Sequence, residues 1–185
     1  MEQVSIPISI ISLAVSLGTF WLAFLRGGAL KMTTPTVIFF GYDVVPKVTP
    51  KVFLRTLLYC TATKGKIIEG MYVNVRHRDS EQVFGFWGYG ETEKLTVGSG
   101  LHVSQTGVSA NHHFVLSVHA GGYAFDAGEH LITVFARIVG DKKPTQLAQI
   151  VVNLKPELAD ALGRREGVLF ERAAEGQYEG HTQQR

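Results

Sequence analysis

The chain has little cysteine and little excess charge, and each shortage excludes a class of protein. Its one cysteine, Cys60, rules out an intrachain disulfide. The formal net charge is only +2 over 185 residues, so we expect no nucleic-acid partner. Neither the G-x-S-x-G turn of serine hydrolases nor the G-x-x-x-x-G-K-[ST] phosphate loop occurs. We therefore expect a protein that is not an enzyme and needs no cofactor.

Residues 4–25 lack charged side chains and are mostly apolar. A helix of that length reaches about 33 Å, enough to cross a hydrocarbon core of about 30 Å. No Lys or Arg precedes the stretch and bulky residues end it, which argues against a cleaved signal peptide. The sequence predicts one transmembrane helix over residues 4–25, with membrane lipid as its surroundings.

Small polar residues recur at alternating steps of four and three along this stretch, which places them on one helix face. Such a face lets two helices approach closely, so it predicts self-association or packing on a partner helix. The alternative is that small hydroxyl residues are simply tolerated there. The residues concerned are Ser5, Ser9, Ser12, Ser16 and Thr19.

The flanking charges predict the orientation of the helix. Glu2 lies on the amino side, while Arg26 and Lys31 lie on the carboxyl side. Because Lys and Arg favour the cytoplasmic side, we expect a single-pass protein of the cell (inner) membrane with a cytoplasmic domain. A periplasmic domain is the alternative.

From residue 35 the pattern changes from helical to strand-like. Short β-branched, aromatic and aliphatic runs alternate with Gly, Pro, Asp and Lys turns, which is typical of an all-β domain. We expect that domain over residues 35–155, after a linker over 26–34, and period-two alternation places Cys60 in its core. A short helical and docking segment is expected over 156–172 and a disordered tail over 173–185.

Residues 126–132 read DAGEHLI and resemble the D-x-G-x-Y-x-C corner of immunoglobulin-like domains, with His130 for Tyr and Ile132 for Cys. The resemblance implies an immunoglobulin-like Greek-key β-sandwich whose structural corner is formed by Asp126, Gly128 and His130. In that family the ring at the fifth position bonds to backbone near the corner, a role that His130 would take. Residues 36–43, 51–61 and 98–114 also resemble a family of uncharacterised bacterial membrane-anchored proteins, which implies a prokaryotic setting.

Two histidines are candidate metal ligands. If the chain turns back at residues 106–107, His102 and His112 lie close together across a hairpin, where they suit zinc or copper. No cysteine or carboxylate stands at ligand spacing in that hairpin. The alternative is a set of polar strand residues, and we expect no metal site.

An aromatic strand over residues 82–89 is apolar on both faces. Val83, Trp87 and Tyr89 share one face, and Phe84 and Phe86 the other. The first face is either a patch for a protein partner or is covered by residues 167–170. Together these features predict a membrane-anchored interaction or scaffold module. The alternatives are an envelope-side receptor domain for a ligand or metal, and an accessory subunit of a membrane complex.

Overall fold

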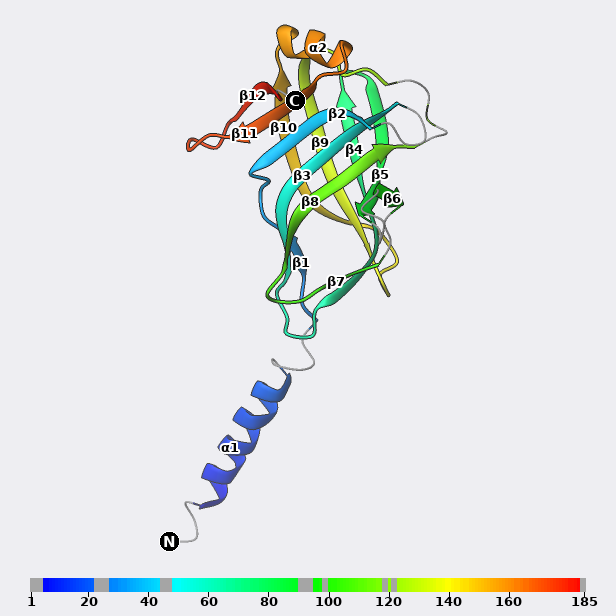
Figure 1. The fold of residues 1–185 in the computed structure, drawn as a ribbon. Helices are drawn as coiled ribbons and strands as arrows, with labels where there is room; N and C mark the ends of the chain where they lie inside the picture. Colours follow the sequence, from blue (N-terminus) through cyan, green and yellow to red (C-terminus); the bar gives the residue numbers. More distant parts are fainter. Residues whose placement is uncertain are drawn as a thin grey trace.

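The computed structural model describes residues 5–21, 27–43, 48–89, 95–97, 100–117, 120 and 123–183 of the chain. Within these ranges one helix precedes a strand-built body, and a second helix caps that body (Figure 1). Strands dominate the described chain, so the expected all-β class is confirmed.

Helix α1 (Ser5–Phe20) lies inside the span predicted over residues 4–25. Residues 4 and 22–25 of that prediction fall outside the described ranges. Figure 1 shows α1 projecting from the strand-built body, and every side chain described from residue 7 to residue 21 is exposed. Within the described ranges, no helix combines the length and the apolar character that a membrane crossing requires.

Twelve strands are described, and two of them are longer than the rest. β3 and β4 each have 12 residues. The strands are β1 (Leu30–Met32), β2 (Val37–Asp43), β3 (Thr49–Cys60), β4 (Lys66–His77), β5 (Ser80–Tyr89), β6 (Leu95–Val97), β7 (Leu101–Val103), β8 (Val108–Leu116), β9 (Gly128–Ile138), β10 (Thr145–Leu154), β11 (Gly167–Arg172) and β12 (Tyr178–Gln183).

These strands form one antiparallel sheet in the order β10-β9-β4-β5-β8-β3-β2-β11-β12, with β1 on β3, β6 on β5 and β7 on β4. The sheet curls until it nearly closes, so that β10 approaches β1 and β12 (Figure 1). A single sheet thus replaces the two separate sheets expected of a sandwich. The physical reason is the length of β3 and β4, which lets each pair with two strands along the same edge. The first half of β3 pairs with β2 and its end with β1. The start of β4 pairs with β7 and its second half with β5.

Alternate residues of the strands fill the interior of the curled sheet. On β3, Val52, Leu54, Leu58 and Cys60 are fully buried, as the period-two pattern predicts. Burying a side chain such as Phe contributes about 1.5–3 kcal/mol. The largest apolar side chains that are fully buried come from four different strands and are Phe40, Phe84, Phe114 and Phe170.

Two segments expected outside the domain are strands of the sheet, and these expectations were wrong. Part of the linker over 26–34 forms β1, where Leu30 is 5% exposed. Part of the tail over 173–185 forms β12, which pairs with β11 along its whole length. The tail has few apolar residues to bury, so main-chain hydrogen bonds to β11 hold it in place. Gly180 also lies so close to Leu158 and Phe170 that a Cβ at this position would approach their side chains to within 3 Å.

Helix α2 (Pro156–Gly163) lies where the sequence predicts a short helix, with Pro156 in its first turn. It buries Leu158, Ala161 and Leu162 against one end of the sheet. The chain then enters β11, which pairs with β2 and places Phe170 edge-on against Phe40 at 5.2 Å between ring centroids. The predicted docking of residues 167–170 therefore takes the form of a strand.

Candidate functional site

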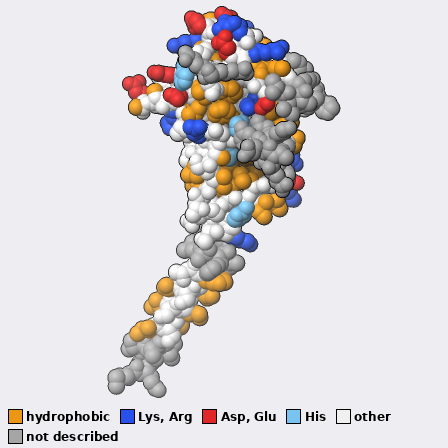
Figure 2. Space-filling model, viewed as in Figure 1, with side chains coloured by type: hydrophobic (Ala, Val, Ile, Leu, Met, Phe, Trp, Pro, Cys, Tyr) orange, Lys and Arg blue, Asp and Glu red, His pale blue; other side chains and the backbone are white. Residues whose placement is uncertain are grey.

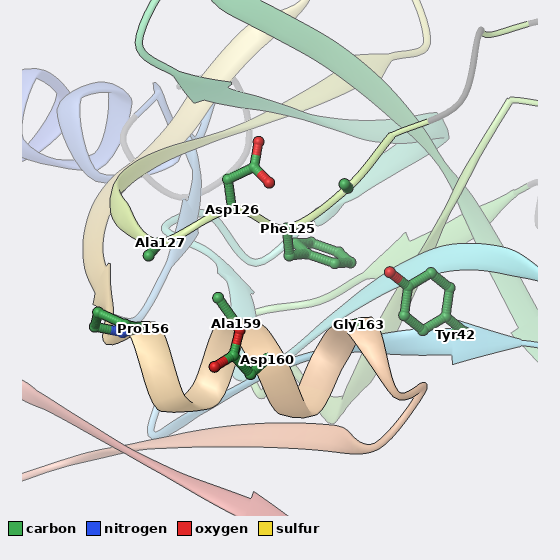
Figure 3. Close-up of a pocket in the computed structure, with 9 residues that line it drawn as sticks. Tyr42, Phe125, Asp126, Ala127, Pro156, Ala159, Asp160 and Gly163 are labelled. Carbon is green, nitrogen blue, oxygen red and sulfur yellow. The ribbon is translucent and has the colours of Figure 1, made fainter.

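A pocket of about 270 Å³ lies between α2 and the chain segment that leads into β9 (Figure 3). α2 turns its apolar side chains toward the sheet, which leaves its small residues along the pocket. Figure 3 shows the ring of Phe125 and the hydroxyl end of Tyr42 pointing toward each other across it. The lining residues are Tyr42, Ala124, Phe125, Asp126, Ala127, Pro156, Ala159, Asp160 and Gly163.

The aromatic wall of the pocket is rigidly packed. Phe125 is 3% exposed, stacks on Phe40 at 4.7 Å between centroids, and meets the rings of Tyr42 and Tyr123 edge-on. Burial raises the pKa of Tyr42, with a smaller lowering by the Arg165 guanidinium. The Tyr42 hydroxyl therefore stays protonated at neutral pH and is available to donate or accept one hydrogen bond.

The lining of the pocket combines apolar side chains with a phenol and two carboxylates. Among the described residues the lining holds no Ser, Cys, Lys or His, and its polar side chains are those of Tyr42, Asp126 and Asp160. Asp126 and Asp160 are exposed. In Figure 3 the carboxylate of Asp126 turns away from α2. The pocket suits a small group with one apolar face for Phe125 and a polar atom for Tyr42.

The predicted corner has a defined geometry. His130 is fully buried at the start of β9, and its Nε2–H donates to the carbonyl oxygen of Asp126 at 2.8 Å. Its other nitrogen, Nδ1, lies 3.4 Å from the Tyr123 hydroxyl. Gly128 has a φ of +128°, and a Cβ at this position would lie 2.9 Å from Cε1 of His77. The ring at the fifth position of the motif thus bonds to backbone at the corner, as it does in the resembled family.

His77, at the end of β4, is a neighbour that the sequence analysis missed. Its ring stacks on that of His130 with centroids 4.4 Å apart and planes 19° apart. Its Nδ1–H donates to the carbonyl oxygen of Glu129 at 2.9 Å, and the residue is 7% exposed. No local sequence pattern marks this contact, because it results from the antiparallel pairing of β4 with β9, in which Arg76 is opposite Leu131.

The two candidate metal ligands lie on strands that do not pair with each other. His102 is opposite Ile67 on β4, whereas His112 is opposite Leu54 on β3. The expected hairpin at residues 106–107 was wrong. β8 pairs with β3 and β7 pairs with β4, so the two strands do not pair with each other. No cluster of three or more metal-ligating side chains is present in the described parts of the chain.

Burial affects the ionisation of two other histidines. His112 points into the core and is 3% exposed, and burial lowers its pKa. His113 lies on the outer face, where burial and the nearby Lys51 ammonium lower its pKa to about 4 while the Asp43 carboxylate acts in the opposite direction. Lys51 and Asp43 themselves form an ion pair of 2.8 Å. Both histidines are therefore neutral at pH 7.

The predicted partner patch is part of a longer, mostly apolar row on the outside of the sheet. Val83 is 48% exposed, Trp87 is half-buried, and the side chain of Tyr89 lies outside what the structure describes. β8, β3 and β2 separate β5 from β11, so residues 167–170 do not cover this face. Directly paired positions across six strands form the row Val97, Trp87, His113, Phe53, Phe39 and Leu169. Figure 2 shows apolar side chains among charged ones on the face presented by β2, β3 and β8.

The small polar residues of α1 lie on an exposed helix. Ser9, Ser12, Ser16 and Thr19 are all exposed, and the side chain of Ser5 lies outside the described part. The Thr19 hydroxyl donates back to the carbonyl oxygens of Val15 and Ser16, both at 2.9 Å. Because that hydroxyl already donates within its own helix, Thr19 would contribute to packing against a second helix through its small size.

These features were compared with those of known proteins. No protein-family model matches the chain, and neither the curated proteins nor the solved structures gave a match.

Proposed function

We propose that the protein is a membrane-anchored interaction module whose α1 enters the lipid and holds the strand-built domain beside the bilayer. The observation that carries this proposal is the exposure of α1. Its large apolar side chains are 54–63% exposed, and no charge interrupts residues 5–21. Figure 2 shows apolar side chains along the helix. A continuous apolar surface of this kind marks a site that lipid or another protein covers.

The remaining parts of the proposal rest on α1, on the basic residues after it and on the corner at the start of β9. Ser9, Ser12 and Ser16 leave one side of α1 small enough for a second helix, its own copy or a partner's. Arg26 and Lys31 after the apolar stretch favour a cytoplasmic domain in a bacterial inner membrane. The corner geometry of His130 supports the immunoglobulin-like relationship.

A flotation experiment with liposomes tests the anchor. The full chain is mixed with phospholipid vesicles and centrifuged through a density gradient, and we expect it to float with the lipid. The Leu13→Asp/Leu17→Asp variant is expected to remain at the bottom, because each charge costs about 2.5–3.5 kcal/mol at the centre of a membrane helix. The matched control is Val139→Asp/Val151→Asp, which adds the same charge at exposed valines of the domain. Equal flotation of both variants would reject the proposal.

The pocket favours a second candidate, a ligand-binding receptor domain. Its lining places the Phe125 ring and small apolar side chains beside the Tyr42 hydroxyl, so phenol, an aromatic ring with one hydroxyl, is a suitable probe. We expect phenol to shift the methyl NMR signals of Ala127 and Ala159. In the Ala159→Leu variant, whose larger side chain fills the pocket, the shift of Ala127 is expected to vanish. Unchanged methyl signals in the wild-type protein would argue against this candidate.

A further inference from the structure

The stacked rings of His77 and His130 hold the segment that leads into β9. Each ring donates one N–H to a main-chain carbonyl of this segment, at Glu129 and Asp126 respectively. Carbonyl oxygens only accept hydrogen bonds, so His77 carries its proton on Nδ1 and His130 on Nε2. The contacts thus fix the tautomer of both rings, and the arrangement is complete with one proton on each.

A second proton would place a charge on a buried ring, and on His77 it would find no hydrogen-bond acceptor among the described residues. Nε2 of His77 is buried and has no hydrogen-bond partner among the described residues. Nδ1 of His130 faces the Tyr123 hydroxyl, and the ring is fully buried. Two protonated rings would place like charges 4.4 Å apart in a site shielded from water.

The groups around the pair do little to offset that charge. Phe40 from β2 and Phe125 from the preceding segment contact His130 with their rings, and Val152 is its neighbour on β10. Tyr123 contributes a neutral hydroxyl. Asp126 favours the charged form of His130, but its side chain is exposed; burial outweighs it and lowers the pKa of His130.

We propose that the His77–His130 stack is a pH-operated latch that keeps residues 123–129 closed when both rings are neutral and releases them in mild acid. Opening lets a ring reach water and take up a proton, and it breaks the two bonds to the Asp126 and Glu129 carbonyls. The released segment includes Phe125 and Ala127, which form one wall of the pocket. Acid would therefore open the pocket at the α2 end while the rest of the sheet stays paired.

The sign of the effect follows from linkage. Burial holds the folded-state pKa of His130 below the ordinary histidine value of about 6.5. The closed form is then fully favoured above pH 6.5 and loses that preference as pH falls below it. Each proton taken up by the open form changes the equilibrium by up to about tenfold per pH unit.

Hydrogen–deuterium exchange of the full chain tests the latch. After correction for intrinsic rates, we expect amides of residues 123–130 to exchange at least about tenfold faster at pH 5.0 than at pH 7.5. Amides of β3 and β8 are expected to change less than those of the corner, because acid exposes them only through global unfolding. The double variant His77→Phe/His130→Phe keeps two stacked rings without titratable nitrogens, and its corner should not respond to pH. The matched control is His181→Gln, an exposed histidine on β12 whose replacement should leave the response unchanged.

Three results would overturn the proposal: an unchanged corner, a loosening shared equally by β3 and β8, or a response that persists in the double variant. Should the double variant fail to fold, ¹⁵N NMR of the wild-type imidazoles decides. We expect an Nδ1–H tautomer for His77 and Nε2–H for His130 at pH 7.5, with protonation of His130 and a change of the Tyr123 signals occurring together below pH 6.5. Rings that remain neutral to pH 5.0, or protonate without any change at Tyr123, would reject the latch.

Discussion

The hydroxyl of Tyr178 donates a hydrogen bond of 2.7 Å to the main-chain carbonyl of Pro35, and so ties β12 to the segment just before β2. The contact is partly buried, and removing the hydroxyl leaves that carbonyl without this partner. We expect Tyr178→Phe to lower the free energy of unfolding by about 1 kcal/mol, measured by urea denaturation. Tyr72→Phe is the control, since the Tyr72 ring stacks on Phe135 and its hydroxyl makes no hydrogen bond within the described residues. Equal losses in both variants would show that the Tyr178 hydrogen bond makes no specific contribution to the free energy of unfolding.

Gly180 gives a test of how tightly β12 packs. A Cβ at this position would lie 2.6 Å from Leu158 Cδ1 and 2.9 Å from Phe170 Cε1. We expect Gly180→Ala to lower the free energy of unfolding by about 1–3 kcal/mol, because both side chains must shift. Gly85→Ala, which meets nothing within 4 Å, is the matched control and should change stability little. A harmless Gly180→Ala would indicate that β12 is loosely held.

Gly128 is constrained by its backbone conformation and by the ring of His77. Its φ is +128°, and a Cβ would lie 2.9 Å from Cε1 of His77. Gly140 has a φ of +91° but nothing within 4 Å, so Gly140→Ala reports the backbone strain without the clash. We expect Gly128→Ala to cost more than the roughly 1–3 kcal/mol of backbone strain alone. In a double-mutant cycle with His77→Ala, the excess over Gly140→Ala should disappear; an excess that persists would assign the cost to the backbone.

Buried neutral histidines make stability depend on pH. His112, His113 and His130 have lowered pKa values, and that of His113 falls to about 4. The unfolded chain binds more protons below about pH 6.5, so the free energy of unfolding should decrease as pH falls from 6.5 toward 4, by up to about 1.4 kcal/mol per pH unit for each such proton. His113→Phe places a non-titrating ring beside Phe53, and urea denaturation between pH 7.5 and pH 4.5 should show a shallower loss. An identical pH profile would mean that His113 does not contribute.

The sequence predicted those features that depend on local pattern. The strand class of the domain, the buried face of β3 and the short helix after residue 155 all follow from periodicity and from Pro156. The contact of His130 with the Asp126 carbonyl joins residues only four apart, which is why a short motif indicates it.

Features that depend on distant pairing were not predictable in the same way. β7 and β8 follow each other across a short turn, yet they pair with β4 and with β3 and β5 respectively. Polar composition suggested disorder for the tail, but main-chain hydrogen bonds to β11 do not depend on side-chain polarity. The pocket and the His77–His130 stack each join segments far apart in the chain, so no local pattern marks them.

The position of β11 between β2 and β12 has a consequence for synthesis. β2 is made early but gains its second neighbour only when residues 167–172 have been translated, close to the carboxyl end. During translation the edge of β2 therefore stays open, and α1 leaves the ribosome before the body can close. A nascent chain with an apolar helix and an open strand edge is prone to aggregation, so early capture of α1 by lipid or a chaperone would protect the chain until its last strand arrives.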